Sequence, residues 1–414
     1  MPTIKKVKEN SEPVAEVMIQ DRKWIGFFAA AFSLTVVYAA SAAPIPLYTT
    51  YRQTLDLTNG DLSMTAFAYF AGCMIALLVF ARVSNYSGRR PVALVTLGLA
   101  AIGCLVFLYL QNDSMFLVGR FIQGISCGLA SSTISAYVVD TAPENPRWLG
   151  AAVTSGAVMM GLSVGVFGSG TLKEIGPGSL TLIYGILIGL IAVCGLLIAA
   201  GPETMKPAPG MAASLVPQIR VPGNIRPLLL PASCTFIGVW AIGGFYQAFS
   251  SSMASDLLGT TNTIVAATVF ASMMAPNAIG GALSGRFRPD VAQRFGIGVF
   301  VLCIFAILIS LNYGATVPFL VANVGAALAG GFAFTGSMRA LLDKTSQEDR
   351  AGVLSTIFLI SYSGAGLPNL IVGRLSGSFG LFEIAIGYGV LVGVTCIITL
   401  LTARPDIDHI GAGE

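Results

Sequence analysis

Charged side chains are scarce in this sequence: Asp, Glu, Lys and Arg make up 10% of its 414 residues, whereas a soluble domain carries about 25%. Hydrophobic residues make up 55%. So few charges cannot cover the surface of a water-soluble domain, and their shortage therefore excludes a soluble globular fold. The formal net charge of +3 gives no reason to expect a nucleic-acid partner.

Histidine and closely spaced cysteines are missing as well. The single histidine, His409, lies near the C-terminus, and the seven cysteines include no Cys-x-x-Cys pair. A Gly-x-x-x-x-Gly-Lys-Ser/Thr loop is also absent. These absences argue against a metal centre, a disulfide framework and an ATP-driven motor. We therefore expect no metal and no cofactor, and an enzyme would lack a nucleophile paired with a base.

Apolar residues are grouped into repeated runs of roughly 20, the length at which an α-helix crosses a hydrocarbon core about 30 Å thick. The sequence therefore predicts an all-α membrane protein with twelve transmembrane helices. The runs are residues 24–48, 62–82, 92–111, 115–138, 149–171, 179–200, 228–251, 264–285, 295–313, 317–338, 352–372 and 382–402.

Basic residues are distributed unevenly between the loops. Of the 23 Lys and Arg residues, only Arg52, Lys173 and Arg374 fall on one side of the predicted membrane, Arg120 falls within a span, and the others lie on the opposite side. Because cytoplasmic loops are enriched in Lys and Arg, both termini are predicted to be cytoplasmic. We expect a multi-pass protein of a bacterial-type inner membrane.

The two halves of the chain resemble each other. Residues 116–120 read FLVGR and residues 319–323 read FLVAN, so Asn323 takes the place of Arg120 at a spacing of 203 residues. Parallel repeats of this kind are found in transporters built from two six-helix bundles. A proline-rich segment between the halves has the composition of a linker. We therefore expect two bundles, residues 24–200 and 227–402, joined by a central cytoplasmic linker, residues 201–226. We also expect a cytoplasmic tail at each end, residues 1–23 and 403–414.

The short loop ARVSNYSGRRPV, residues 81–92, resembles the loop signature G-x-x-x-D-R-x-G-R-R of the major facilitator superfamily. Gly88, Arg89 and Arg90 match this pattern, whereas Asn85 replaces its acidic residue. The resemblance implies the fold of this family, with two pseudo-symmetric six-helix bundles. It also implies a cytoplasmic latch between the bundles, which an amide in place of the acid should weaken.

The fourth predicted span contains RFIQGISCG, from Arg120 to Gly128, which resembles the family pattern R-x-x-Q-G-x-G with one additional residue. In the family this arginine is associated with proton coupling. A charge inside the membrane costs at least about 2.5 kcal/mol, so Arg120 should face a cavity or a partner. The alternative is that Arg120 only holds neighbouring helices together by bonding their backbone carbonyls.

Gly156, Gly161, Gly165 and Gly168 lie in the fifth predicted span, which is similar to the glycine-rich antiporter motif of drug and metabolite exporters. Val166 replaces the proline of that motif. The resemblance favours export. Small residues also let helices approach closely, so interhelical packing alone is the alternative.

Acidic residues are absent from the middle of every predicted span. Asp61, at an outer helix end, and Asp140, at an inner one, are the candidates to carry protons. Capping of a helix end is the alternative for each of them.

Polar and aromatic residues near the middle of the spans outline a candidate substrate site. Aromatic faces, scattered amides and one positive charge suit a modest-sized amphiphile, with Arg120 as a contact for an anion. Each aromatic residue taken alone is also explained by helix packing or by contact with lipid. The candidates are Tyr38, Arg120, Gln123, Trp240, Tyr246, Gln247, Asn277, Asn323 and Tyr362.

These features together predict a secondary transporter that exposes a central site to each side of the membrane in turn. We favour export of a drug-like compound or small metabolite in exchange for protons. Uptake or facilitated diffusion of a small polar or anionic solute is the first alternative, and a non-transporting receptor or scaffold is the second. The expected partners are a small-molecule substrate, protons and the lipid bilayer, and the protein should function as a monomer.

Overall fold

The computed structural model describes residues 12–143, 146, 149–176, 178–217, 219–375 and 379–403, with side chains from Lys23 onward except that of Ala213. Within these residues all regular structure is helical. Twelve helices are long and apolar enough to cross a membrane, which confirms the predicted architecture. The described residues do not include the two ends of the chain, residues 1–11 and 404–414 with His409, or Arg147. The orientation of the termini stays a prediction.

The first bundle contains six spanning segments, and short additional helices extend several of them. Pro44 and Pro46 interrupt the first segment near its outer end, because proline removes a backbone hydrogen-bond donor. The elements are α2 (Glu12–Ala42), η1 (Ile45–Leu47), α3 (Tyr48–Leu55), α4 (Asn59–Ile75), η2 (Ala76–Phe80), α5 (Ser84–Ser87), α6 (Arg89–Leu108), α7 (Asp113–Leu129), η3 (Ala130–Ile134), α8 (Ser135–Thr141), α9 (Leu149–Lys173) and α10 (Ser179–Ala200).

The second bundle repeats this arrangement with six spanning segments. Pro231, Pro276 and Pro368 lie inside three of its helices without ending them. The elements are α12 (Arg226–Ser252), η5 (Met253–Leu257), α13 (Thr263–Ser284), α14 (Pro289–Asn312), α15 (Thr316–Leu342), α16 (Arg350–Leu375) and α17 (Leu381–Thr402).

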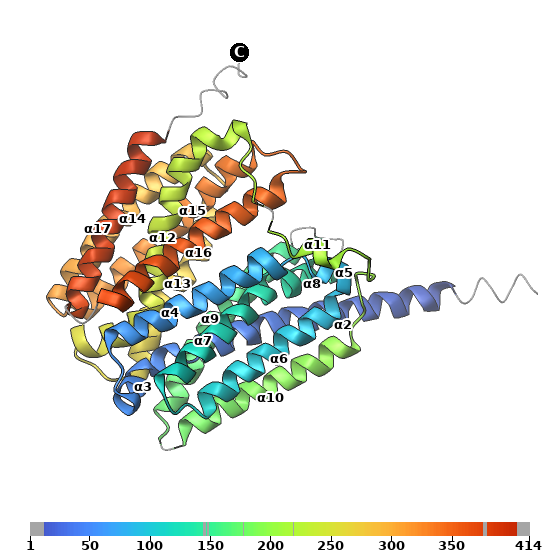
Figure 1. Cartoon of the computed structure of the whole chain (residues 1–414), viewed down its shortest axis with the longest axis horizontal. Helices are drawn as coiled ribbons and strands as arrows, with labels where there is room; N and C mark the ends of the chain where they lie inside the picture. Colours follow the sequence, from blue (N-terminus) through green and yellow to red (C-terminus); the bar gives the residue numbers. More distant parts are fainter. Residues whose placement is uncertain are drawn as a thin grey trace, which may run out of the picture.

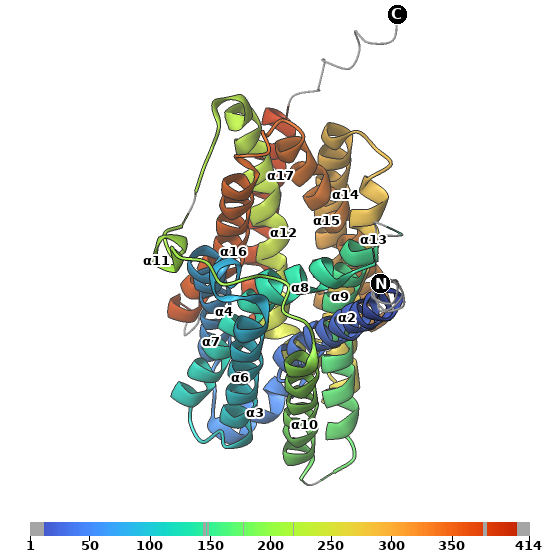
Figure 2. The same ribbon diagram turned by 90° about the vertical axis from the view of Figure 1, so that its right-hand side faces the viewer.

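The two bundles lie close together near α3, and their helices diverge toward the linker (Figure 1). The linker between α10 and α12 contains α11 (Met211–Ser214) and η4 (Gly223–Ile225), and it passes the ends of α5 and α8 (Figure 2). It is held there by Ala208, whose backbone N–H donates to the carbonyl of Tyr86 at 2.9 Å. The linker therefore packs on the first bundle before it reaches the second.

Glycines at corresponding positions allow close helix contacts in both bundles. A Cβ added to Gly128 of α7 would lie 2.6 Å from the Cβ of Ala76, and one added to Gly331 of α15 would lie 2.0 Å from the carbonyl oxygen of Asn277. The two glycines are 203 residues apart, which is the spacing of the sequence repeat. The internal repeat is thus also present in the packing of the helices.

Candidate functional site

A cavity of about 340 Å³ lies between the two bundles. Its wall is formed by α2, α4 and α9 of the first bundle and by α12, α13, α14, α15 and α16 of the second. Two hollows of about 610 Å³ lie elsewhere, one an apolar groove between α16 and α17 and the other a polar recess at the outer face. Of these three hollows in the described part of the chain, the central cavity is the one at the position where rocking bundles expose a site to each side in turn.

Aromatic, methionine and amide side chains form the wall of the central cavity. The ring centroids of Trp240 and Tyr362 lie 4.7 Å apart, so the two rings form one continuous apolar surface. Met159 and Met273 add adaptable apolar contacts from opposite bundles. The predicted substrate contacts that line this cavity are Tyr38, Trp240, Gln247, Asn277 and Tyr362.

Five further aromatic residues of the wall were missed in the sequence: Tyr69, Phe70, Phe270, Phe300 and Phe334. The ring centroids of Phe70 and Tyr362 lie 6.2 Å apart and connect the two bundles across the cavity. The run FAYF at residues 67–70, in the second span, is the signal that could have identified the first two. Aromatic residues in a transmembrane helix face protein and lipid alike, so the run alone did not indicate a cavity.

Arg120 is fully buried inside the first bundle and does not line the cavity. Its Nη1 donates to the carbonyl oxygen of Ser41 and to Oε1 of Gln123, both at 2.8 Å. Gln123 in turn donates from Nε2 to the carbonyl of Ala40 at 3.0 Å. In this structure both side chains bind the backbone of α2 behind the cavity wall, and their role in substrate binding or coupling stays a prediction.

The charge of Arg120 reaches the cavity through Tyr69. The guanidinium carbon lies 4.6 Å from the centroid of the Tyr69 ring, in a cation–π contact. Arg120 Nε and Nη2 are buried without a hydrogen-bond partner. Among the described residues no carboxylate forms an ion pair with this guanidinium. Its positive charge is therefore not neutralised by a neighbouring acid.

Asn323, at the position equivalent to Arg120, is buried inside the second bundle. Its Oδ1 accepts from the hydroxyl of Tyr246 at 2.5 Å, and its Nδ2 donates to Oγ of Ser272 at 3.0 Å. Neither Asn323 nor Tyr246 lines the cavity. They connect α12, α13 and α15 to one another, and their predicted role in substrate binding or coupling stays a prediction.

The glycines of α9 fall into two pairs. A Cβ added to Gly161 or Gly165 would lie 2.5 or 2.4 Å from a backbone carbonyl oxygen of α2, so only glycine permits this close approach. A Cβ added to Gly156 or Gly168 would meet no atom within 4 Å. The predicted interhelical contact is therefore wrong for Gly156 and Gly168.

The two candidate proton carriers both lie at helix ends. Asp61 accepts hydrogen bonds from the backbone N–H and the hydroxyl of Thr58 at 2.8 and 2.7 Å, in a capping box at the start of α4. Oδ2 of Asp140 accepts from Nε of Arg89 at 3.0 Å. Neither carboxylate lines the cavity, and their role as proton carriers stays a prediction.

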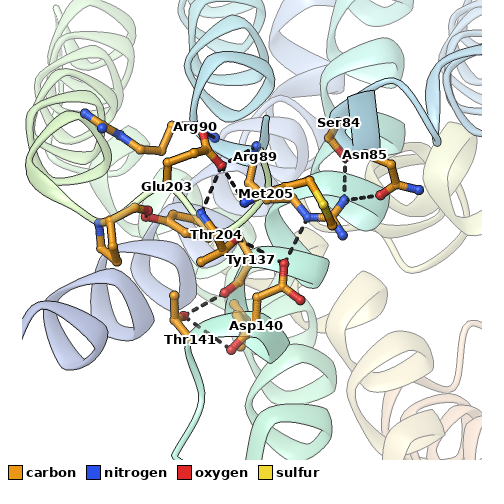
Figure 3. A network of polar contacts seen from close by, with 12 residues as sticks. Ser84, Asn85, Arg89, Arg90, Tyr137, Asp140, Thr141, Glu203, Thr204 and Met205 are labelled. Carbon is orange, nitrogen blue, oxygen red and sulfur yellow. Dashed lines mark hydrogen bonds and ion pairs between the residues drawn. The ribbon is translucent and has the colours of Figure 1, made fainter. Parts of the chain in front are cut away.

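Arg89 is the centre of a polar network at the end of the first bundle that meets the linker (Figure 3). Besides its ion pair with Asp140, it donates from Nη1 at 2.7 Å to both the hydroxyl of Ser84 and Oδ1 of Asn85. Asn85, which replaces the acid of the family signature, is thus still an acceptor for this arginine. The bond lacks a formal negative charge and is therefore weaker than an ion pair.

Glu203 of the linker supplies an acid to this network (Figure 3). Its carboxylate accepts from the backbone N–H groups of Arg89 and Arg90 at 2.8 and 3.1 Å, at the start of α6, where a negative charge is favoured. Gly88 has a φ of 97°, and a Cβ there would lie 2.7 Å from the carboxylate, so both geometry and space require glycine.

Glu203 was missed in the sequence because 114 residues separate it from Arg89. The signal that could have identified it is a single acid in the linker, directly after the sixth span. In the part of the chain that the structure describes, the hydrogen bonds of Arg89, Arg90 and Glu203 stay within the first bundle and the linker. The predicted latch between the bundles therefore stays a prediction.

Polar contacts join the two bundles at the ends away from the linker, which are the outer ends in the predicted orientation. The hydroxyl groups of Thr49 and Ser251 lie 2.6 Å apart, and the backbone N–H of Thr49 donates to Ser251 Oγ at 3.1 Å. Arg52 forms an ion pair with Asp256 at 2.6 Å. We call these four residues the outer clasp, because they bind the first bundle to the second on the outer side of the cavity.

A second contact on the same side joins α9 to α13. Thr263 donates from its backbone N–H and its hydroxyl to Oε1 of Glu174 at 2.8 and 2.7 Å. These two hydrogen bonds hold the pKa of Glu174 below its ordinary value, because they stabilise the ionised carboxylate. The outer ends are thus closed at two separate places around the cavity.

Comparison with known proteins agrees with this geometry. Residues 27–368 match the family model described as Major Facilitator Superfamily. The chain is 25% identical over 388 residues to the multidrug resistance protein MdtL of Citrobacter koseri, covering 92% of this chain and 96% of that protein. A match to MdtL of Klebsiella pneumoniae is 31% identical over 125 residues and covers 29% of this chain and 31% of that protein. The quinolone resistance protein NorA of Staphylococcus aureus is 20% identical over 223 residues, covering 54% of this chain and 57% of that protein.

A solved structure shares the fold. It is a bacterial homolog of the human lysosomal transporter Spinster, with a TM-score of 0.73 and 16% sequence identity, and the match covers 92% of this chain and 97% of that one. The family model spans most of the chain, and twelve of its helices are able to cross a membrane. This protein therefore belongs to the Major Facilitator Superfamily and is a multi-pass membrane transporter rather than an enzyme.

Proposed function

We propose that this protein exports modest-sized amphiphilic compounds by alternating access, in exchange for protons. The observation that carries the proposal is the central cavity, whose wall comes from both bundles and combines aromatic, methionine and amide side chains. Aromatic and methionine surfaces adapt to ligands of different shape, while amides orient a polar group. The MdtL and NorA relatives are resistance proteins by name, which supports export.

The cycle follows from the contacts that must break and form. The outer clasp and the Glu174–Thr263 contact keep the cavity closed on the outer side. Release of the substrate outward requires these contacts to separate while the bundles approach each other near the linker. The tight approach of α9 to α2 at Gly161 and Gly165 keeps the first bundle rigid during this rocking motion.

A proton carrier outside the cavity is consistent with the proposal. Asp140 pairs with Arg89 next to the linker, whereas the hydrogen bonds of Asp61 stay within the first turn of its own helix. Protonation of Asp140 would remove the charge that holds Arg89 and would loosen the cytoplasmic network. We therefore assign the coupled proton to Asp140 rather than to Asp61.

Facilitated diffusion of a neutral or anionic solute is the second candidate function. The observation that favours it is that none of the residues lining the central cavity is acidic. Proton antiport through a single shared site needs a carboxylate that alternates between proton and substrate. A transporter without one there can move its substrate without moving protons.

The test uses purified protein in liposomes with an acidic lumen and follows lumenal pH while drugs, sugars and organic anions are added one at a time. We expect one class of amphiphile to evoke proton efflux from the lumen as the compound accumulates inside. Replacement of Asp140 by Asn should abolish this proton flux. Transport of a compound without any proton movement would instead support facilitated diffusion.

A matched pair of tryptophan variants makes the test specific for the cavity. Trp240 lines the cavity, whereas Trp24 is 37% exposed and stacks on Phe28 at the cytoplasmic part of α2. Trp240→Leu should abolish transport, and Trp24→Leu should leave it unchanged. Equal transport by the two variants, or no transport of any compound by the unaltered protein, would contradict the proposal.

A further inference from the structure

We infer that the central cavity takes neutral or anionic aromatic amphiphiles and disfavours organic cations, because the charge of Arg120 acts on bound ligands through the Tyr69 ring. This inference rests on the proposed function of the cavity as the substrate site. It adds the charge class of the substrate, which the aromatic wall alone does not determine.

The wall of the cavity carries no compensating negative charge. The eighteen residues that line it are uncharged, and the amides of Gln247 and Asn277 are its donors and acceptors apart from tyrosine hydroxyls and the Trp240 N–H. Aromatic rings attract cations through their faces, so a wall of this composition would by itself suit an organic cation. The nearest formal charge therefore decides the sign of the ligand.

The charge in contact with this wall is Arg120, which lies against the Tyr69 ring. Its guanidinium is permanently charged, fully buried, and bound to uncharged groups: the Ser41 carbonyl and the Gln123 side chain. Two of its nitrogens have no partner, and no described carboxylate pairs with it. In the low dielectric of the bundle this charge is screened much less than it would be in water.

Tyr69 transmits this charge because Arg120 already covers one face of its ring. The guanidinium carbon lies 4.6 Å from the ring centroid, so a ligand that stacks on Tyr69 from the cavity uses the other face. A cation there would lie about 4.5 Å beyond the ring, and thus about 9 Å from the guanidinium. At an effective dielectric constant of about 20, two like charges at this distance repel each other by about 1.8 kcal/mol. Because about 1.4 kcal/mol corresponds to a tenfold change in affinity, this repulsion weakens binding of the cation about 20-fold.

A pair of isosteric fluorescent probes tests the inference by binding. One is a dansyl amide with a 3,3-dimethylbutyl group, which is neutral, and the other has a 2-(trimethylammonio)ethyl group of the same shape. Binding is followed by energy transfer from Trp240 in a background in which the other two tryptophans, Trp24 and Trp148, are replaced by Phe. The quantity measured is the ratio of the two dissociation constants, cation over neutral.

Variants of Arg120 and Gln123 isolate the contribution of the Arg120 charge to this ratio, because the cost of removing the cationic probe from water is the same in all of them. Gln123→Glu keeps the shape of the side chain and places a carboxylate 2.8 Å from Arg120 Nη1, where it neutralises the guanidinium. Arg120→Met removes the charge, and Arg120→Lys keeps it as the matched control. We expect the ratio to fall about 20-fold in Gln123→Glu and in Arg120→Met, and to stay within about twofold in Arg120→Lys.

The outcomes separate this inference from the proposed function. A ratio that is the same in Gln123→Glu as in the unaltered protein would overturn the inference, while binding of the neutral probe would still support the cavity as a substrate site. Failure of both probes to bind the unaltered protein would refute the proposed function and the inference with it. Gln123→Glu keeps the size and shape of the side chain and loses only the hydrogen bond that Gln123 donates to the Ala40 carbonyl, so the test does not depend on whether Arg120→Met folds.

Discussion

Removing the outer clasp should shift this transporter toward its outward-open state. The clasp consists of two contacts that exist only while the outer ends are closed, the Arg52–Asp256 ion pair and the Thr49–Ser251 hydrogen bonds. The perturbation is the double variant with Asp256→Asn and Ser251→Ala. Both substitutions lie outside the cavity and leave its wall intact.

The magnitude follows from the exposure of each contact. The side chains of Arg52 and Asp256 are 31% and 35% exposed, so their ion pair is screened by water and contributes about 0.5 kcal/mol. Ser251 is buried, and loss of its hydrogen bonds to Thr49 costs about 1 kcal/mol. The sum of about 1.5 kcal/mol raises the ratio of outward-open to outward-closed protein roughly tenfold.

The assay measures the distance between spin labels on the two bundles. Thr54 of α3 and Thr261 before α13 are exposed at the outer ends, and cysteines placed there report the separation of the bundles. Cys303 is the described native cysteine that is not buried, and it is replaced by Ser beforehand. In the double variant the population with the longer distance should increase about tenfold.

A matched control variant tests whether the shift is specific to the outer clasp. Glu383 is also an acid on that side, but it accepts its hydrogen bond from Gly380 within the second bundle, and it forms no ion pair with the first bundle among the described residues. Glu383→Gln should therefore leave the distances unchanged. An unaltered distance distribution in the double variant, or an equal shift in the control, would refute the assignment of the clasp.

Three further predictions address other contacts. Gly165→Ala should destabilise the protein by about 1–3 kcal/mol and lower its unfolding temperature in detergent, because the added methyl overlaps a carbonyl oxygen of α2. Gly168→Ala should have no such effect, and equal unfolding temperatures for the two variants would contradict this prediction. Glu203→Gln should weaken the attachment of the linker to α6 by about 1 kcal/mol, measured as faster proteolysis within the linker, and unchanged cleavage would argue against it. The Glu174–Thr263 contact is complete above the ordinary pKa of glutamate, about 4.3, and it is lost as the pH falls through the lowered pKa of Glu174. Acidification of the outer side should therefore lengthen the distance between the spin labels. Glu174→Gln should abolish this response to pH.

The predicted spans agree with the observed helices because their signal is local and strong. A hydrocarbon core requires runs of about 20 apolar residues whatever the fold, so a run such as 179–200 is recognised without knowledge of its neighbours. The structure has α10 at Ser179–Ala200, in agreement with that run. The family was likewise recognised from short patterns, since Gly88, Arg89 and Arg90 carry the loop signature within a few residues.

The substrate site was predicted only in part because the spans are apolar on all sides. In a soluble helix, hydrophobic periodicity separates the buried face from the exposed one, but in a membrane both lipid and protein favour apolar residues. Tyr69 and Tyr246 therefore look equivalent in the sequence, although Tyr69 lines the cavity and Tyr246 binds Asn323 inside the second bundle. Gly165 and Gly168 are equally indistinguishable until the neighbouring helix is placed.

The sequence by itself determined that this chain spans a membrane twelve times, consists of two related halves and has a single arginine within a span, because each of these can be read from the composition or pattern of individual segments. Only the tertiary structure decided what Arg120 touches, which aromatic residues form the cavity and that Glu203 caps α6. Those facts depend on pairs of segments far apart in the chain, such as the 114 residues between Glu203 and Arg89. Contacts at such separations are determined by helix packing, which local composition does not encode.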